Sequence, residues 1–210
     1  MLNLKPKLFA VLMLLFWAMS SQAQMHYTLA LKGGISNCNG LNHAFTYDDD
    51  GYRIENMYIV TDGNHYSYGL MYAIEASVIE PIEKTRISLE TGLGFESKDF
   101  WVSRSTSEKS VPYSRNCMSL TIPLKVHYAL SNNRFSIWGG GSNVVRLKYT
   151  SLGTNYRYNV RANVGGDWTL VNRYLVGLEY AHDITPFSKM KYYDISYRFD
   201  LIALKVGILF

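Results

Sequence analysis

The chain has 210 residues, with 21 lysines and arginines against 17 aspartates and glutamates and a formal net charge of +4. The charges are scattered rather than clustered, which argues against a nucleic-acid partner, and the length suits a single domain. Tyrosine (17) and glycine (16) are unusually frequent, and no apolar run of 18 residues follows the N-terminal segment, so the composition favours an all-β chain without a transmembrane helix.

The N-terminal segment is typical of an export signal. Lys5 and Lys7 supply a basic start, and the apolar run from Leu8 to Met19 is too short to span a bilayer comfortably. Ser21-Gln22-Ala23 then offers the small-x-small pattern that a signal peptidase recognises. We therefore expect a signal peptide at residues 1–23 rather than a retained anchor.

Period-two alternation of apolar and polar residues predicts eight strands, because successive side chains of a strand point to opposite faces. The predicted strands cover about residues 27–36, 66–78, 86–98, 118–128, 135–149, 156–169, 174–182 and 195–210. The last is organised around an apolar face of Ile202, Leu204, Val206, Ile208 and Phe210, whose intervening residues are smaller or charged apart from Leu209. No helical periodicity competes with this pattern after residue 23.

The connections between the predicted strands alternate in length. They are short at residues 80–84, 131–133 and 171–172 and longer at 37–65, 99–116 and 183–194, while the connection after the fifth strand is moderate. Short turns on one side and long loops on the other are typical of a transmembrane β-barrel. We therefore predict that residues 24–210 form an eight-stranded, antiparallel, up-and-down transmembrane β-barrel, with a lipocalin-like soluble barrel as the alternative.

Aromatic residues on the apolar face gather near the predicted strand ends. One set, expected at the periplasmic boundary, is Tyr128, Phe135, Trp168, Tyr174 and Phe210. The other set, expected at the external boundary, is Tyr66, Tyr68, Phe95, Tyr149 and Tyr156. Two aromatic girdles of this kind mark the membrane interfaces of a barrel.

Three short segments of the predicted strands carry a family resemblance: Leu29-Ala30-Leu31-Lys32-Gly33-Gly34, Leu120-Thr121-Ile122-Pro123-Leu124-Lys125 and Gly207-Ile208-Leu209-Phe210. They resemble the outer-membrane β-barrel domain family of Bacteroidetes, the PorT-like group of porin-family proteins. The resemblance implies the outer membrane of a Gram-negative bacterium, contact with outer-membrane lipid, and recognition of the C-terminal strand by the assembly machinery. One relative serves protein secretion, and most members have no assigned activity.

The face opposite the apolar one carries charges of both signs, which this register directs into the lumen. Eight strands leave an interior just wide enough for side chains, so we expect a plug of mutually paired charges rather than a conducting pore. Pro123 lies within this pattern and deletes one ladder hydrogen bond, so a bulge or a bridging side chain is expected there. The predicted lumen residues are Lys32, Glu75, Glu90, Glu96, Lys125, Arg146, Arg157, Arg161, Asp167, Glu179 and Lys205, with His127.

Several residue groups invite a chemical interpretation that their spacing does not support. Lumen-facing His127 and the rim residues His182, Asp183 and Ser196 could form a hydrolase site, but no strained nucleophile turn surrounds a serine. The contiguous aspartates at 48–50 do not have the alternating spacing of a calcium loop. The glycines at 139–141 lack the lysine and helix of a phosphate-binding loop. No catalytic, cofactor-binding or metal-binding residue is therefore assigned.

Cys38 and Cys117 are the only cysteines, and an exported compartment permits a disulfide between them. Their predicted strands are not neighbours, so a bridge would need the loops to fold inward. Both the bridged and the free form remain open from the sequence.

The sequence predicts a non-enzymatic protein that acts through its external loops as an interaction, secretion or envelope accessory protein. The long first connection, residues 37–65, motivates this prediction, because exposed loops rich in Tyr, Asn and Asp suit surface contact. The alternatives are a lipid-modifying hydrolase of the outer membrane and a barrel that binds a small solute or ligand.

Overall fold

The computed structural model describes residues 25–41, 46–47, 53–54, 67–105, 110–130, 134–147, 154–171, 173–186, 188–190 and 195–210. The predicted signal peptide and the aspartates at 48–50 lie outside these ranges. The long strands are β1 (His26–Leu41), β4 (Ser67–Pro81), β5 (Ile87–Ser105), β6 (Ser110–Ala129), β7 (Phe135–Arg146), β9 (Tyr158–Leu170), β10 (Tyr174–Asp183) and β12 (Ile195–Leu209). The short ones are β2 (Thr46–Tyr47), β3 (Arg53–Ile54), β8 (Thr154–Asn155) and β11 (Ser188–Met190). Within the described ranges, no helix is long and apolar enough to cross a membrane.

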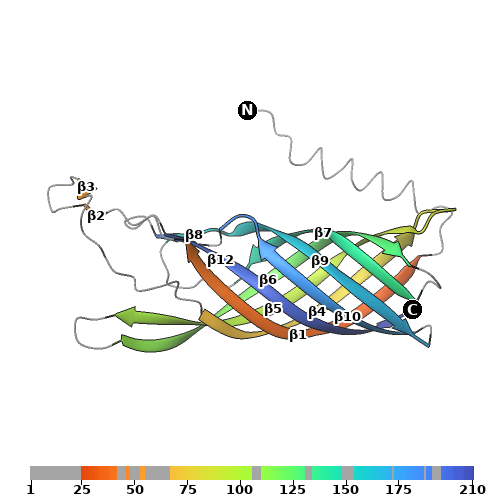
Figure 1. Cartoon of the computed structure of the whole chain (residues 1–210), viewed down its shortest axis with the longest axis horizontal. Coiled ribbons are helices and arrows are strands. Elements are labelled where there is room, and N and C mark those ends of the chain that lie inside the picture. The colour runs from red at the N-terminus through yellow and green to blue at the C-terminus, as the bar shows by residue number, and fades with distance from the viewer. Residues whose placement is uncertain are drawn as a thin grey trace.

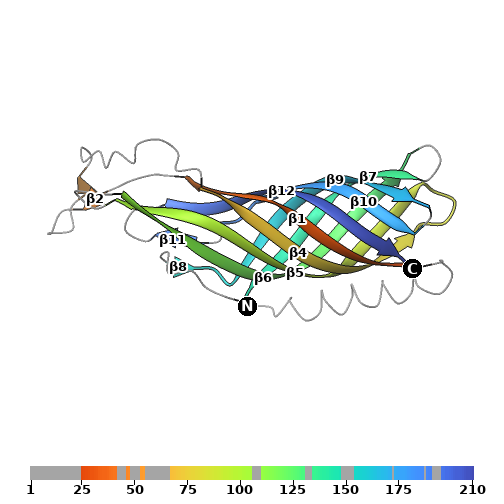
Figure 2. The same ribbon diagram turned by 90° about the horizontal axis from the view of Figure 1, so that it is seen from below.

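The eight long strands form a closed antiparallel barrel, as predicted (Figure 1). Each pairs with its neighbour along the chain, and β12 closes the barrel against β1, for example through Lys32 opposite Lys205 (Figure 2). The strands are staggered around the barrel. Starting at His26 on β1 and moving from each residue to its ladder partner on the next strand, one returns to β1 at Ser36, ten residues further along the chain. A stagger of this size over eight strands corresponds to a tilt of about 40° from the barrel axis.

Short turns lie at the end of the barrel that holds the chain's C-terminus. The turn after β9 is closed by the amide of Arg173, which donates to the Leu170 carbonyl at 3.1 Å. Val171 in this turn has φ 48°, and Lys84 in the turn after β4 has φ 61°. Both are left-handed conformations, which suit hairpin turns but strain a β-branched residue such as valine.

A hairpin arm projects from the opposite end of the barrel. β5 pairs with β4 up to Lys98, and β6 pairs with β7 from Ser119 onward. Beyond these points β5 and β6 continue to pair with each other through Ser105 opposite Ser110 (Figure 1). The predicted loop at 99–116 is therefore wrong, because most of it is strand. Its run of aromatic and β-branched residues, from Phe100 to Val102, favours an extended ladder.

The ladder between β5 and β6 adjusts around Pro123. Paired residues stop at Thr91 opposite Leu124 and resume at Gly94 opposite Thr121, in the same register. No extra residue is inserted, so there is no bulge. Instead the Thr91 hydroxyl donates to the Pro123 carbonyl at 3.0 Å. Of the two expected solutions, the structure uses the side-chain hydrogen bond.

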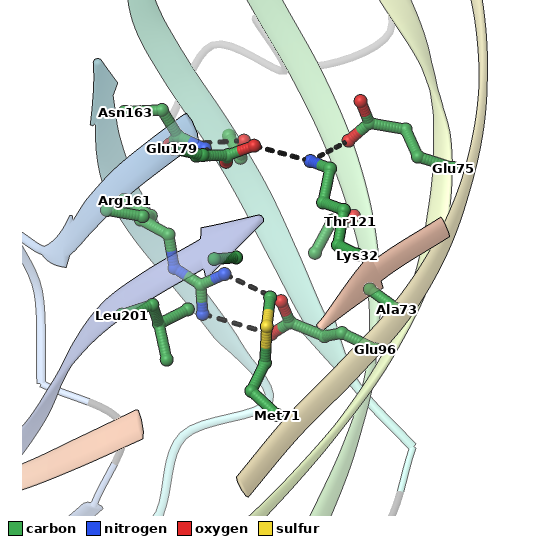
Figure 3. A pocket seen from close by; sticks show the side chains of 13 residues that line it. Lys32, Met71, Ala73, Glu75, Glu96, Thr121, Arg161, Asn163, Glu179 and Leu201 are labelled. Atoms are coloured by element: carbon green, nitrogen blue, oxygen red, sulfur yellow. Dashed lines mark hydrogen bonds and ion pairs between the residues drawn. The ribbon is translucent and has the colours of Figure 1, made fainter. Parts of the chain in front are cut away.

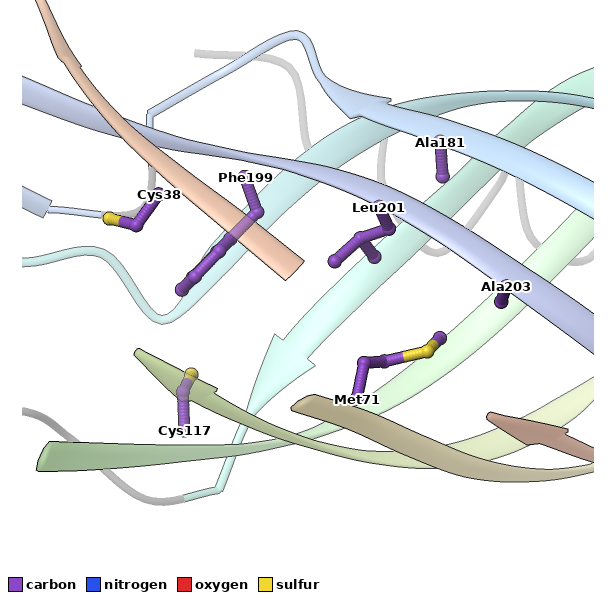
Figure 4. Packing of buried hydrophobic residues seen from close by; sticks show 7 residues of the cluster. All are labelled: Cys38, Met71, Cys117, Ala181, Phe199, Leu201 and Ala203. Atoms are coloured by element: carbon purple, nitrogen blue, oxygen red, sulfur yellow. The ribbon is translucent and has the colours of Figure 1, made fainter. Parts of the chain in front are cut away.

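A small apolar cluster lies inside the barrel toward the arm (Figure 4). Its members are Cys38, Met71, Cys117, Ala181, Phe199, Leu201 and Ala203. Both cysteines are buried free thiols in this structure, on the non-adjacent strands β1 and β6. The cluster covers one end of the polar interior described below.

Candidate functional site

The outer surface of the barrel is mainly apolar on every long strand. The alternation predicted from the sequence places one face of every long strand outward, and large hydrophobic side chains on it are well exposed, including Leu31, Leu124, Leu178 and Leu204. Leu204 is 63% exposed, whereas its neighbours Ala203 and Lys205 are 2% and 1% exposed. A water-soluble barrel would show the reverse distribution.

A girdle of aromatic side chains surrounds the end of the barrel that has the short turns. All five residues predicted there are exposed, and Tyr27, whose amide donates to the Phe210 carbonyl, joins them. At the other end Tyr68 and Tyr156 are exposed as predicted, while Phe95 lies deeper, opposite Ile74 and Leu120. The side chains of Tyr66 and Tyr149 lie outside the described residues. The chain is a transmembrane β-barrel.

The lumen contains ten of the eleven charged residues predicted to face it, and His127 with them. The exception is Arg157, which the prediction placed within a strand. β9 begins only at Tyr158, so Arg157 lies in the preceding bend, exposed, with its guanidinium 5.9 Å from the centre of the Tyr158 ring. Lys98 and Asp183 are two further buried lumen charges that the prediction did not include.

Lys32 and Lys125 organise the middle of the lumen. The Lys32 ammonium bonds Glu75 at 2.7 Å and Glu179 at 2.6 Å, each from a different strand (Figure 3). The Lys125 ammonium lies 2.9 Å from the second oxygen of Glu75 and 3.3 Å from Glu90. Each carboxylate is therefore held between two strands or more. Such bridges fix the strands relative to one another, because a buried charge that lost its partner would be costly.

Arg161 organises the lumen nearer the arm. Its guanidinium makes two parallel bonds to Glu96, at 2.7 and 3.0 Å (Figure 3). A third bond, from Arg161 Nε to Asp183, is 2.8 Å long. The Lys98 ammonium adds a bond of 2.6 Å to Glu96 and lies 4.5 Å from the centre of the Phe199 ring. The polar network thus runs directly into the apolar cluster.

Trp138 fills the lumen near the short-turn end. The Lys125 ammonium lies 4.6 Å from the centre of its ring, within cation–π range. Gly165 faces the indole, and a Cβ at this position would lie 2.5 Å from Trp138 Cζ2. Gly165 is therefore glycine because the Leu178 carbonyl oxygen and the Trp138 ring together occupy the space that a side chain would need.

Little empty space remains between these side chains. A cavity of about 10 Å³ lies among Lys32, Glu75, Glu96, Arg161 and neighbouring residues (Figure 3). This volume holds about one water molecule. The prediction of a packed, polar lumen agrees with this geometry, and the cavity leaves no room for a ligand larger than water.

One group of lumen residues has the donor types of a metal site. Oxygen or nitrogen atoms of Glu90, His127 and Asp167 lie within 4.8 Å of one another. His127 Nε2 is 2.5 Å from Glu90, however, and Asp167 bonds the Lys205 ammonium at 2.8 Å. The Lys125 ammonium lies 3.3 Å from Glu90, so the ammonium groups of Lys125 and Lys205 already supply the positive charge that a metal ion would bring. We assign no metal to this group.

The residues of the predicted hydrolase alternative are not brought together. Asp183 is fully buried in the lumen against Arg161, whereas its neighbour His182 points outward. Ser196 lies four residues before Asp200 on β12, a separation of about 13 Å along a strand. His182 instead bonds Asp200, directly opposite it on β12, at 2.7 Å through Nδ1.

Comparisons with known proteins found similarity only at the level of fold. No protein-family model and no curated protein sequence matches the chain, so the resemblance to the Bacteroidetes family stays a prediction. Among solved structures, the barrel is similar to Neisserial surface protein A (8% identity, TM-score 0.42), covering 86% of this chain and 96% of that one. It is also similar to OprG from Pseudomonas aeruginosa (10% identity, TM-score 0.46), covering 87% and 95%. The attachment invasion locus protein Ail of Yersinia pestis matches with 9% identity and a TM-score of 0.39, covering 87% of this chain and 98% of that one.

Proposed function

We propose that this chain is a closed outer-membrane barrel that acts without catalysis, through its external end, as an interaction partner in secretion or envelope assembly. The observation that carries the proposal is the filled lumen. Six buried carboxylates each have a cation within 3.3 Å, and the cavity beside Lys32 and Arg161 has about 10 Å³. This interior does not support the passage of solutes. We therefore assign the function to the external end of the barrel.

The hairpin arm is the part of the external end best suited to a partner. It continues for seven residues beyond Lys98, or about 20 Å at the rise of a strand. Among the described residues, no other strand pairs with either edge of the arm. An unpaired strand edge can accept an extended segment of another protein by adding it to the ladder. An envelope protein with an extended segment is therefore the expected partner class.

The experiment shortens the arm without touching the barrel wall. Residues 100–115 are removed and Asp99 is joined to Asn116, its ladder partner, through an Asn-Gly turn. Mild detergent extracts of outer membranes from both strains are then compared on native gels with mass spectrometry. We expect the complete protein to migrate in a larger assembly and the shortened protein to migrate alone.

The control is heat-modifiable migration of the shortened protein, which shows that the barrel has folded. Assembly of the folded, shortened protein into the same complex would overturn the role of the arm. Single-channel recording in planar bilayers tests the other part of the proposal. Steady ionic currents through the complete barrel would contradict a closed lumen.

A further inference from the structure

A group of polar residues lies on the outer face of the barrel, where apolar side chains are otherwise the rule. They are Asn37 on β1, Tyr180 and His182 on β10, and Arg198 and Asp200 on β12, here called the outer-face cluster. Their positions alternate with the buried lumen residues Cys38, Ala181, Phe199 and Leu201, so all five are on the outward side. Ionisable residues that face lipid are costly and mark a function by default.

Asp200 is the centre of the cluster. Its carboxylate accepts a hydrogen bond of 2.9 Å from the Tyr180 hydroxyl and one of 2.7 Å from His182 Nδ1. Nδ1 donates to the Asp200 carboxylate, so the other ring nitrogen, Nε2, faces away from Asp200. The His182 side chain is 44% exposed, so this edge is open to the outside of the barrel. The carboxylate thereby orients an imidazole toward the surrounding membrane.

Two atoms of the cluster are buried without a hydrogen-bond partner among the described residues. They are Arg198 Nε, a donor, and Asn37 Oδ1, an acceptor. Arg198 is two residues from Asp200 on the same face of β12, about 7 Å along the strand, and Asn37 is directly opposite Asp200 on β1. Buried polar atoms are almost always paired, so these two atoms show that the hydrogen-bonding capacity of Asn37 and Arg198 is not fully used within the described part of the chain.

The position of the cluster fits the headgroup level of a membrane. Asp200 is opposite Asn37, and Asn37 is opposite Tyr68, a residue of the aromatic set at the external end. On the short-turn side of the cluster the same strands expose Leu178 and Ile202, both more than half exposed. A molecule bound here would have its polar part at the external interface and its apolar part along these side chains.

We propose that the outer-face cluster binds the phosphorylated headgroup of a lipid in the outer leaflet. The Arg198 guanidinium donates to the phosphate oxygens, and the imidazolium form of His182 donates to them through Nε2, an arrangement that suits oxyanions. Tyr180 and Asp200 position His182, and the acyl chains cover Leu178 and Ile202.

The test measures lipid binding to the delipidated, full-length barrel by native mass spectrometry. The probe is dimyristoyl phosphatidic acid, and dimyristoylglycerol, which has the same acyl chains and no phosphate, is the matched comparison. We expect one phosphatidic acid to bind, and the diacylglycerol to bind at least about tenfold more weakly, because the charge-assisted hydrogen bonds are missing. Equal binding of the two lipids would overturn the proposal.

Two substitutions assign the binding to the cluster. Arg198→Gln and His182→Gln together should weaken the binding of phosphatidic acid about tenfold or more. Arg157→Gln, which removes an exposed arginine at the same end of the barrel, should leave the affinity unchanged. Heat-modifiable migration confirms folding, and Arg198→Gln alone is used if the double variant does not assemble. Unchanged affinity in the folded variant would overturn the assignment.

Soluble glycerol 3-phosphate distinguishes a lipid site from a site for free phosphate. At the concentration of the lipid it should not compete, since it lacks the acyl chains that contact Leu178 and Ile202. Competition at equal concentration would contradict the lipid assignment.

Discussion

Arg161 on β9 and Glu96 on β5 meet across the barrel interior in a pair of parallel hydrogen bonds, 2.7 and 3.0 Å long. Arg161 also bonds Asp183 at 2.8 Å. Arg161→Met should therefore destabilise the barrel by about 3 kcal/mol or more, because it leaves the buried Asp183 carboxylate without its bonded cation. Urea unfolding of the barrel reconstituted in lipid vesicles measures the change.

The matched control is Arg157→Met, at the exposed arginine in the bend before β9. It should change the free energy of unfolding by less than about 0.5 kcal/mol. Adding Asp183→Asn to Arg161→Met should recover part of the loss, since the uncompensated charge is then removed. Equal stability of Arg161→Met and the unmodified barrel would show that the lumen network does not hold the strands together.

Val206→Arg tests which face of β12 meets lipid. Val206 is 58% exposed, with Leu31 and Val176 opposite it on the neighbouring strands. A charged side chain on the lipid face costs about 2 kcal/mol or more, so the folded, heat-modifiable form should be strongly reduced. Val171→Arg, in a turn outside the barrel wall, should assemble normally. Equal yields of the two folded variants would contradict the register.

Gly165→Ala tests the packing of Trp138 in the lumen. A Cβ at this position would lie 2.5 Å from Trp138 Cζ2 and would also contact the Leu178 carbonyl oxygen. We expect a loss of stability of about 1–3 kcal/mol, as is typical for overpacked interiors, and a shift in the tryptophan fluorescence. Gly139→Ala is the control, because its Cβ would meet nothing nearer than 3.9 Å. The same loss in both variants would contradict a specific role for Gly165.

Val171→Asn should stabilise the turn between β9 and β10. Val171 has φ 48° and is 86% exposed, so its β-branched side chain is strained without gaining buried contacts. Asparagine tolerates this conformation, and the gain should be about 0.5–1 kcal/mol in urea unfolding. Val171→Ala, which still disfavours positive φ, should gain less. A loss of stability on Val171→Asn would show that the turn has another conformation.

The barrel itself could be predicted from the sequence because alternation is a local property. Lys205 between Leu204 and Val206 already shows which residues share a face, and the lumen charges follow strand by strand. Strand ends were less predictable. The predicted connection at 99–116 is instead largely a continuing ladder, in which Asp99 is opposite Asn116. The prediction that Arg157 faces the lumen is wrong because it depended on the start of a strand, and β9 begins one residue after Arg157.

Partners across strands could not be predicted, because they depend on the stagger of the whole barrel. His182 was grouped with Asp183, its neighbour in the chain, although the alternation directs adjacent residues to opposite faces. Its bonded partner, Asp200, is 18 residues away and becomes its neighbour only through the register of β10 against β12. The same argument applies to Arg161 and Glu96, which are 65 residues apart.

In this barrel, β12 directs its even-numbered residues to lipid and its odd-numbered residues to a closed polar lumen. Nitroxide labels placed singly on residues 202–208, in a background with Cys38 and Cys117 replaced by alanine, test it directly. Collision with dissolved oxygen, which concentrates in lipid, should be highest at Ile202, Leu204, Val206 and Ile208 and low at the residues between them. Maxima at the odd-numbered residues, or no two-residue period, would contradict the inside-out arrangement.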